Sequence, residues 1–303
     1  MDKTEQFTGL LQEKRILVAD GAWGTEMVRL GLKTGECPET WNIRHPDIIK
    51  GIARSYRDAG ADIVLTNTFG GNRIKLKRFG LEDKVCQLNR EGVRLSKECA
   101  GGALVFASVG PTGELLAPVG SLDEKEAFQV FVQQIQALVE ADIDGIVIET
   151  MIDLSEALCA LRAARHIDAT IPVVVSMTFA KGIKGFSTIM GITPETASKK
   201  LSLAGAHATG ANCGTGIRDF VEIARQMKPA TRVPLWIKPN AGIPVLKDGL
   251  TVYPDSPEDM AGCIKDIIDA GASIIGGCCG TTPAHIRAIA EEVRKHRTRN
   301  RKS

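Results

Sequence analysis

Four segments of the chain share one pattern, in which a helical stretch ends at a corner and runs at once into a short apolar segment. In three of the four the corner contains glycine, the residue that most often closes a helix. Each segment therefore predicts a helix C-terminus followed by a short buried strand. The four segments are DAGADIVLTNTF (58–69), EADIDGIVIET (140–150), LAGAHATGANCG (203–214) and DAGASIIGGCCG (269–280).

The rest of the chain extends this pattern to eight predicted strands. Their apolar runs are continuous rather than alternating, which is typical of parallel strands buried on both faces. Helical periodicity follows most of them and is clearest over residues 126–141 and 155–166. Eight strand and helix units in 303 residues predict an α/β fold, the (β/α)8 TIM barrel. The strands are expected near 16–22, 62–68, 103–109, 144–150, 172–178, 207–213, 233–239 and 272–277.

An open doubly wound sheet is the competing architecture. Sheets of that kind that bind dinucleotides carry GxGxxG after the first strand. Here DGAWGTE (20–26) stands in that position, which favours the barrel. Because no linker rich in Pro, Gly or Ser divides the sequence, we expect residues 1–303 to form one barrel domain.

Composition and charge exclude several classes of protein. The formal net charge is +2 and charges of both signs alternate along the chain, which argues against nucleic acid as the main partner. No apolar run approaches the roughly 18 residues of a membrane span, and the N-terminus lacks the apolar stretch of a signal peptide. We therefore expect a cytoplasmic protein without a membrane partner. Eight cysteines are too few for a disulfide scaffold, so a cluster of them favours a metal or a catalytic site.

Polar and thiol residues gather at the predicted strand ends, where the chemistry of such a barrel collects. Cys213 ends the sixth strand, and Cys278 and Cys279 follow the eighth. These three predict a three-thiolate zinc site with an open fourth position. The other five cysteines are predicted to be packing thiols. The remaining strand-end residues are Asp20, Asn67, Glu149, Thr178, Asn212 and Asn240.

Cys278 and Cys279 are neighbours in the segment GGCCGTT (276–282). Successive side chains of a regular strand point to opposite faces, so both thiols reach one centre only if the backbone leaves the pleat. The flanking glycines permit that departure.

Together these segments resemble the homocysteine S-methyltransferase family, most closely the homocysteine-binding module of cobalamin-dependent methionine synthase. The resemblance covers about residues 14–290 and rests on DGAWGTE, ADIVLTNTF, GPTGELL, IET, GANCGTG, PNAG and GGCCGTTPAHI. It implies a barrel, zinc held by Cys213, Cys278 and Cys279, and the homocysteine thiol as methyl acceptor. The folate-binding, cobalamin-binding and activation modules of full-length methionine synthase are not among these 303 residues. The sequence is therefore expected to be an excised module or a free-standing enzyme with a separate methyl donor.

Zinc suits the chemistry that the resemblance implies. A free thiol has a pKa near 8.5 and is mostly protonated at pH 7, whereas the thiolate is the nucleophile. Coordination to a metal removes that proton. Three cysteinate ligands keep the site electron-rich, so the bound sulfur stays nucleophilic and no general base is required.

Four more residues are candidates for holding the amino acid. The carboxylates of Asp20 and Glu149 suit its ammonium group, and the N–H groups of Gly21 and Ala22 could take its carboxylate. Asp20 has helix capping or a role in a turn as its alternative, whereas burying Glu149 without a partner would be costly. Asn240 resembles the family position that fills the fourth zinc site before homocysteine arrives, and bracing a loop is its alternative role.

Three functions remain open at this point. Transfer of methyl from methylcobalamin on a separate corrinoid protein or domain is favoured by the resemblance, and transfer from S-methylmethionine or betaine is the alternative. A zinc hydrolase fits less well, because hydrolases prefer His and carboxylate ligands. The basic segment RKHRTRNRKS (294–303) is expected to be a solvated, frayed terminus, or alternatively a docking patch for an acidic partner.

Overall fold

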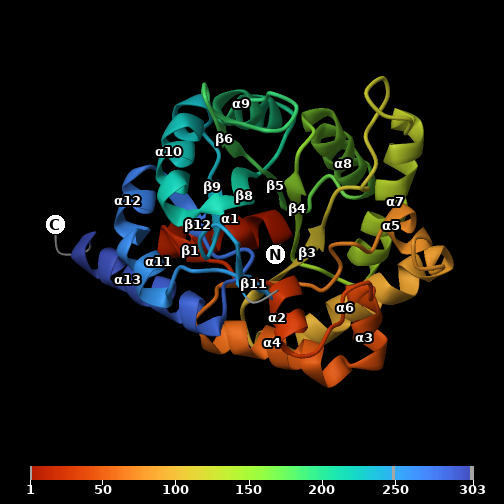
Figure 1. Cartoon of the computed structure of the whole chain (residues 1–303), viewed down its shortest axis with the longest axis horizontal. Coiled ribbons are helices and arrows are strands. Elements are labelled where there is room, and N and C mark those ends of the chain that lie inside the picture. Colours follow the sequence, from red (N-terminus) through yellow and green to blue (C-terminus); the bar gives the residue numbers. More distant parts are fainter. Residues whose placement is uncertain (1, 248–249, 301–303) are drawn as a thin grey trace.

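Eight parallel strands form one sheet that closes into a barrel (Figure 1), as the sequence predicts. The computed structural model describes residues 2–247 and 250–300. Around the sheet the strands follow the order β1, β12, β9, β8, β5, β4, β3, β2, and a parallel bridge between Ala19 and Ile63 joins the two ends. The strands are β1 (Leu17–Val18), β2 (Ile63–Leu65), β3 (Leu104–Val109), β4 (Gly145–Met151), β5 (Val173–Met177), β8 (Ala208–Gly216), β9 (Leu235–Asn240) and β12 (Ala272–Ile275).

Helices surround the barrel and connect its strands (Figure 1). Within the described residues, no helix combines the length and the apolar character that crossing a membrane requires. The helices are α1 (Lys3–Lys14), α2 (Gly24–Arg29), α3 (Trp41–Arg44), α4 (Pro46–Asp58), α5 (Arg73–Lys77), α6 (Val85–Ala100), α7 (Glu124–Glu140), α8 (Leu154–Ile167), α9 (Pro194–Leu203), α10 (Ile217–Met227), α11 (Pro257–Gly262), α12 (Ile264–Asp269) and α13 (Pro283–Asn300), with short 3-10 turns at Pro38–Thr40, Glu82–Lys84 and Lys228–Ala230.

Each of the four repeated corners contains a residue with a positive φ angle. Gly60, Gly205 and Gly271 have φ angles of 103°, 94° and 104°, a backbone conformation that residues other than glycine rarely adopt. In the fourth corner Asp142 adopts φ 64°, and two lysine ammonium groups bind its carboxylate. Asp is one of the few residues that enter the left-handed region without large strain. The repeat in the sequence therefore reflects a repeated change of direction from helix to strand.

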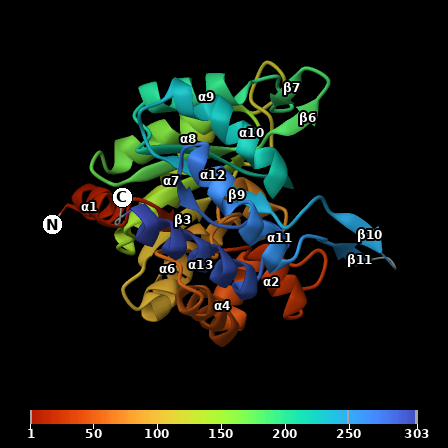
Figure 2. The same ribbon diagram turned by 90° about the vertical axis from the view of Figure 1, so that its left-hand side faces the viewer.

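Helix α1 covers the amino-terminal end of the barrel, on the side away from the strand ends that carry the thiols (Figure 2). Its Phe7 is buried and packs on Phe106 of β3, with ring centroids 5.4 Å apart. Inward-facing apolar side chains from all eight strands form the rest of this inner core, including the fully buried Trp236. The lower barrel is thus filled, and the opposite end stays free for a site.

Two antiparallel hairpins project from the carboxyl ends of the strands and were not predicted from the sequence. One pairs β6 (Ala180–Gly182) with β7 (Gly185–Ser187), and the other pairs β10 (Val245–Lys247) with β11 (Leu250–Val252). Figure 2 shows both on the side opposite α1. Together with the other strand-to-helix loops they form the rim of the barrel mouth.

The described part of the basic segment 294–303 is not a frayed terminus, so that prediction is wrong as far as Asn300. These residues continue α13. The guanidinium of Arg297 donates to the carbonyl of Ile16 and to the carboxylate of Asp62, at the amino-terminal ends of β1 and β2. The described part of the segment therefore lies at the end of the barrel away from the mouth, so it cannot dock a partner over the strand ends. Residues 301–303 lie outside the described residues.

Candidate functional site

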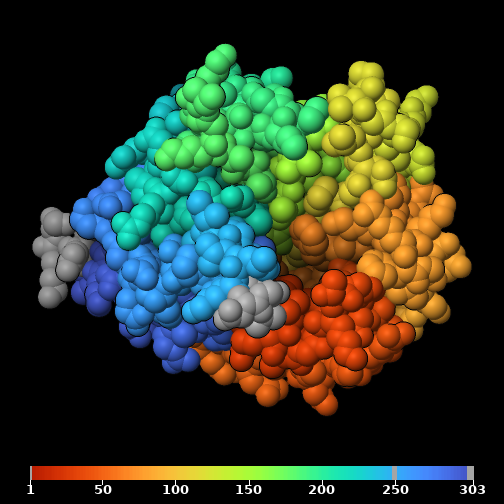
Figure 3. All heavy atoms as spheres, viewed as in Figure 1, coloured from red at the N-terminus to blue at the C-terminus, as the bar shows by residue number. Residues whose placement is uncertain are grey.

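A cavity of about 300 Å³ opens at the barrel mouth, and Figure 3 shows this face hollowed at its centre. The predicted site residues in its wall are Gly21, Ala22, Glu149, Cys213, Cys278 and Cys279. The segment after β1 (residues 21–27), the end of β2 and its loop (65–69), and the turn after β12 (277–279) supply most of the lining. Residues scattered over more than 250 positions of sequence thus meet in one cavity.

Cys213 reaches the cavity because strand β8 departs from regular pairing. The register between β8 and β9 shifts between Asn212 and Gly216. Cys213 itself adopts φ 61°, in the left-handed region, and Gly214 follows with φ 78°. A Cβ at Gly214 would lie 2.4 Å from the carbonyl oxygen of Phe179, so only glycine fits there. This strained turn directs the thiol into the cavity instead of along the pleat.

The neighbouring cysteines lie on a tight turn directly after β12. The Cys278 N–H donates to the Pro239 carbonyl at 2.7 Å, which holds the start of the turn against β9. Thr281 then binds the Cys278 carbonyl twice, from its N–H at 3.1 Å and from its hydroxyl at 2.7 Å. The backbone has left the pleat, as predicted from the glycines, and both thiols face one centre.

The sulfur atoms of Cys213, Cys278 and Cys279 all lie within 4.8 Å of one another. The sulfurs of Cys213 and Cys279 are 3.9 Å apart. Hydrogen bonds from Cys278 and Cys279 lower the pKa of the Cys213 thiol to about 3, whereas the same contacts raise the pKa of Cys278. The cluster therefore already stabilises one thiolate and could hold a metal ion.

Polar groups surround the three thiols. The side-chain amide of Asn212 donates to the Cys278 sulfur at 3.7 Å. Asn240 is buried at the end of β9, where its side chain contributes to lowering the pKa of Cys213, and its amide oxygen is buried without a hydrogen-bond partner. Tyr253, beside β11, packs on Gly280 and hydrogen-bonds Cys279. The partnerless oxygen of Asn240 is the kind of buried acceptor that a bound ion would satisfy.

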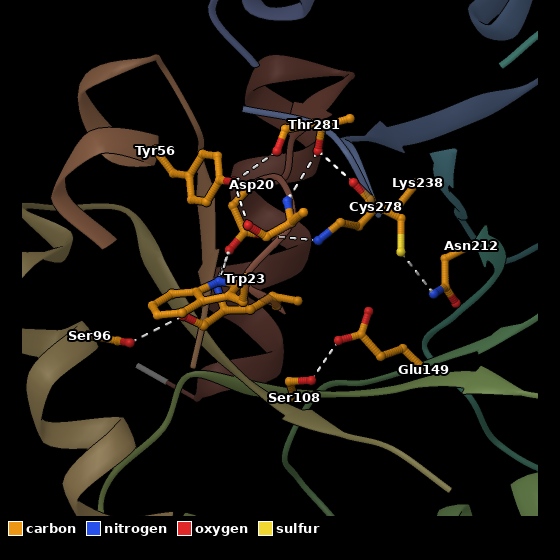
Figure 4. Close-up of polar contacts among 12 residues, drawn as sticks. Asp20, Trp23, Tyr56, Ser96, Ser108, Glu149, Asn212, Lys238, Cys278 and Thr281 are labelled. Carbon is orange, nitrogen blue, oxygen red and sulfur yellow. Dashed lines mark hydrogen bonds and ion pairs between the residues drawn. The ribbon is translucent and has the colours of Figure 1, made fainter. Parts of the chain in front are cut away.

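Asp20 is fully buried, and its carboxylate is committed to other parts of the protein (Figure 4). One oxygen accepts from the Lys238 ammonium at 2.7 Å. The other accepts from the Trp23 indole at 2.8 Å and from the Leu65 N–H at 2.7 Å. Asp20 does not cap a helix, and it is not among the described residues that line the cavity. The substrate contact predicted for Asp20 stays a prediction.

Glu149 lies near the carboxyl end of β4 and forms part of the cavity wall. One of its oxygens accepts the Ser108 hydroxyl at 2.5 Å. Burial raises the pKa of Glu149, and the nearby Lys238 ammonium and the Ser108 hydrogen bond act in the opposite direction. Of the two carboxylates predicted to bind an ammonium group, Glu149 is the one that faces the cavity.

Gly21 and Ala22 line the cavity. A Cβ at Gly21 would lie 2.7 Å from the ring of Tyr56, so this position requires glycine. The Ala22 N–H donates to the Thr281 hydroxyl at 3.1 Å. Its amide is therefore already bonded within the protein, and the carboxylate contact predicted for Gly21 and Ala22 stays a prediction.

Sequence reasoning missed Lys238, which lies in the cavity wall on β9. Burial lowers the pKa of this lysine, but Asp20 and Glu149 outweigh burial and leave it raised. The available signal was a lysine inside the apolar run LWIKPN (235–240), because a buried lysine requires a partner. One other prediction needs correction: Cys86 is exposed and is not a packing thiol, whereas Cys37, Cys99 and Cys159 are buried and Cys263 is half-buried.

These features define a class of protein, the (β/α)8 barrels with a candidate three-cysteine metal centre at the carboxyl ends of the strands. Within that class the sequence identifies one family. A model of the family described as homocysteine S-methyltransferase matches residues 17–293, so the chain belongs to this family of methyltransferase enzymes.

Two curated relatives are methionine synthases. That of Mycobacterium tuberculosis is 31% identical over 96% of this chain and 26% of its own length, and that of Mycobacterium leprae is 30% identical over 92% and 24%. The chain thus spans about a quarter of the length of these relatives. Among solved structures, the metallated homocysteine methyltransferase MmuM from Escherichia coli has a TM-score of 0.78 at 24% identity, covering 93% of this chain and 98% of that chain, a likeness that shows the fold.

Proposed function

We propose that the chain, acting as one homocysteine-binding barrel over residues 1–303, is a zinc-dependent methyltransferase that methylates the homocysteine thiol to methionine. One observation carries this proposal. Three thiols from two distant parts of the sequence converge in one cavity, at the mouth of a barrel that belongs to the homocysteine S-methyltransferase family.

The donor set fits zinc. Tetrahedral zinc with Zn–S bonds of about 2.3 Å brings its sulfur ligands about 3.8 Å apart, close to the 3.9 Å between Cys213 and Cys279. Sulfur ligands suit zinc and exclude magnesium or calcium, which take oxygen ligands. Zinc bound here would supply one function, holding the homocysteine sulfur as thiolate. Asn240 is suited to the fourth position before substrate binds, since its amide oxygen is buried and has no partner.

The protein's own groups would orient the amino acid. Glu149 is suited to accept a hydrogen bond from the ammonium group of homocysteine. It lines the cavity, and Ser108 hydrogen-bonds only one of its two carboxylate oxygens. Gly21 and Ala22 remain our candidates for the substrate carboxylate, and Asp20 a more remote one for the ammonium. Orientation of this kind presents the sulfur toward the open side of the cavity, where a methyl donor must approach.

We further propose that the donor is methylcobalamin carried by a separate corrinoid protein or domain. Two observations support this donor over a small sulfonium or ammonium compound. The sequence relatives are methionine synthases, of which this chain spans about a quarter. Exposed apolar side chains also gather on the loops of the mouth, as expected for a surface that a protein covers. They include Leu115, Val119, Ile183, Ile189, Ile243 and Leu246.

A reducing compartment such as the cytoplasm suits this site, because the proposed ligands must stay reduced to bind metal. The eight cysteines are free in the structure, the three clustered ones included. Thiol ligands that lie within contact of each other would be lost to disulfides in an oxidising environment.

The experiment that tests the function supplies zinc-loaded protein with homocysteine and each donor in turn. Methionine is measured by mass spectrometry, and demethylation of cobalamin by its absorbance change. Methionine formation with methylcobalamin, and not with S-methylmethionine or betaine, is the expected result. If methionine forms only with S-methylmethionine or betaine, that compound is the donor and the corrinoid proposal is wrong. If no donor yields methionine, the proposed function is wrong.

A further inference from the structure

Asn212 is buried beside the cysteine cluster and has no part in the function proposed above. Its side chain is fully buried. Its amide oxygen accepts from the Thr150 N–H at 2.9 Å and from the Ser176 hydroxyl at 2.6 Å. Its amide nitrogen donates to the Thr150 hydroxyl at 2.8 Å and to the Cys278 sulfur at 3.7 Å. Both lone pairs and both hydrogens of this amide are therefore in use.

These contacts fix which way round the amide lies. A backbone N–H can only donate, so the atom of Asn212 that faces the Thr150 N–H must be its oxygen. The nitrogen then has to point toward the Cys278 sulfur, as the dashed line in Figure 4 shows. The direction of the hydrogen bond to the sulfur is thus set by groups outside the cysteine cluster.

One role of this amide is to brace Thr150. Thr150 has φ 61°, a conformation that a β-branched residue rarely adopts, and Asn212 binds both its N–H and its hydroxyl. The register between β4 and β5 also shifts here, between Ile148 and Met151. The brace uses only one of the two amide hydrogens, so it does not account for the bond to Cys278.

The second amide hydrogen points at a sulfur that becomes a far better acceptor when a metal binds. A neutral thiol is a weak hydrogen-bond acceptor, and hydrogen bonds to an ionised acceptor are about twice as strong. Metal ligation requires the three thiols, which lie within 4.8 Å of one another, to be thiolates, whose negative charges repel. An N–H dipole aimed at one sulfur offsets part of that repulsion and holds the ligand in one orientation.

We propose that Asn212 is a positioning residue of the metal centre, which donates an N–H···S hydrogen bond to the Cys278 thiolate and so strengthens zinc binding. The inference rests on the proposed zinc site and adds a residue that contacts a ligand without being one. Asn212 directly precedes Cys213 on β8, so a single strand end supplies one ligand and orients another.

The test uses cobalt(II) in place of zinc, because the sulfur-to-cobalt charge-transfer absorbance responds to electron density on the thiolates. Loss of an N–H···S bond raises the energy of the sulfur electrons and moves this band to longer wavelength. Asn212→Asp keeps the acceptor for Thr150 and Ser176 but lacks the donor, and Asn212→Ala lacks both without adding a charge. We expect the band shift in both variants, and zinc binding roughly 10- to 100-fold weaker by competition with a chelator.

Ser176→Ala is the matched control, because it removes a bond to Asn212 on the side away from the sulfur. It should leave the band and the zinc affinity unchanged. If the band shifts in only one Asn212 variant or in neither, or shifts as much in Ser176→Ala, the amide only braces Thr150 and the proposal is wrong. If the unmodified protein binds neither cobalt nor zinc, the proposed zinc site itself is wrong.

A measurement on the unmodified protein does not depend on the folding of any variant. When zinc is added, the side-chain amide proton of Asn212 that faces Cys278 should move downfield in the nuclear magnetic resonance spectrum, because its acceptor becomes a thiolate. The other amide proton, which faces the Thr150 hydroxyl, should stay in place. Equal shifts of both protons, or no shift of either, would overturn the proposal.

Discussion

The two walls of the cavity are built on opposite principles. On the first wall, Cys213, Cys278 and Cys279 stand on strained or tightly turned backbone, and their thiols mainly contact one another. On the second wall, Lys238 extends from strand β9 and pairs with Asp20, which lies behind the wall, so that each carries the other's counter-charge. The cysteine wall is incomplete without a metal, whereas the ionic wall is complete as it stands.

We therefore expect substitutions in the cysteine wall to affect function and substitutions in the ionic wall to affect stability. Removing a thiol from the cysteine wall deletes a ligand, but the turn that carries Cys278 and Cys279 is held by other hydrogen bonds, such as those that the Thr281 N–H and hydroxyl donate to the Cys278 carbonyl. Removing one partner from the ionic wall leaves a buried charge without compensation, which is strongly destabilising. The predictions below test this comparison, beginning with the largest expected effect.

Cys278→Ala should abolish zinc binding while the protein stays folded. Two thiolates and an amide cannot replace a three-thiolate set, whereas the core packing of the barrel does not involve this thiol. Metal content after dialysis and circular dichroism measure the two effects. Cys263→Ala, a half-buried cysteine outside the cluster, is the matched control and should keep its zinc. Full zinc retention in Cys278→Ala would refute the metal assignment.

Asp20→Ala should lower the free energy of unfolding by about 3–5 kcal/mol, because it leaves the Lys238 ammonium buried and unpaired. Urea denaturation of the metal-free protein measures this. Asp58→Ala breaks an exposed ion pair with Arg57 and should cost at most about 1 kcal/mol. If Asp20→Ala lowers the free energy of unfolding by no more than the control does, Asp20 does not stabilise the protein by compensating the charge of Lys238.

Glu149→Gln should weaken homocysteine binding roughly 10- to 100-fold, since it removes the proposed partner of the ammonium. Burial raises the pKa of Glu149, so its carboxylate gains a proton at a higher pH than an ordinary glutamate. Binding by the unmodified protein should therefore fall more steeply as the pH falls through that raised pKa than binding by the glutamine variant, which keeps only the decline caused by protonation of the thiols. Calorimetry over a pH series measures both. Identical pH profiles for the two proteins would exclude Glu149 as the ammonium partner.

Leu246→Ser should slow methyl transfer from a methylated corrinoid protein several-fold and leave transfer from free methylcobalamin unchanged. Leu246 is exposed on the β10–β11 hairpin at the rim, so its loss affects docking and not the site. Leu203→Ser, equally exposed where α9 ends and the chain returns to the amino-terminal side of β8, is the matched control. Stopped-flow absorbance gives the rates. An equal slowing with both donors would place the effect in the cavity instead of the rim.

The barrel and its thiols could be predicted from local patterns. Most strands are largely apolar runs, and each of the four repeated corners carries Gly60, Gly205, Gly271 or the tolerant Asp142. These are properties of a few consecutive residues, which short-range sterics and burial determine. Cys213 and the Cys278–Cys279 pair were recognisable for the same reason, because strand ends of a barrel share one face.

What the sequence by itself determined was therefore the fold, the cysteine cluster and the family, all of which depend on periodicity and motif. Only the tertiary structure decided how the charges in the cavity are distributed. It paired Asp20 with Lys238 across 218 positions, placed Glu149 in the cavity wall, and took the basic end of α13 to the far end of the barrel. Electrostatic interactions depend on distance in space and on burial, and neither is encoded in the order of residues near a charged side chain.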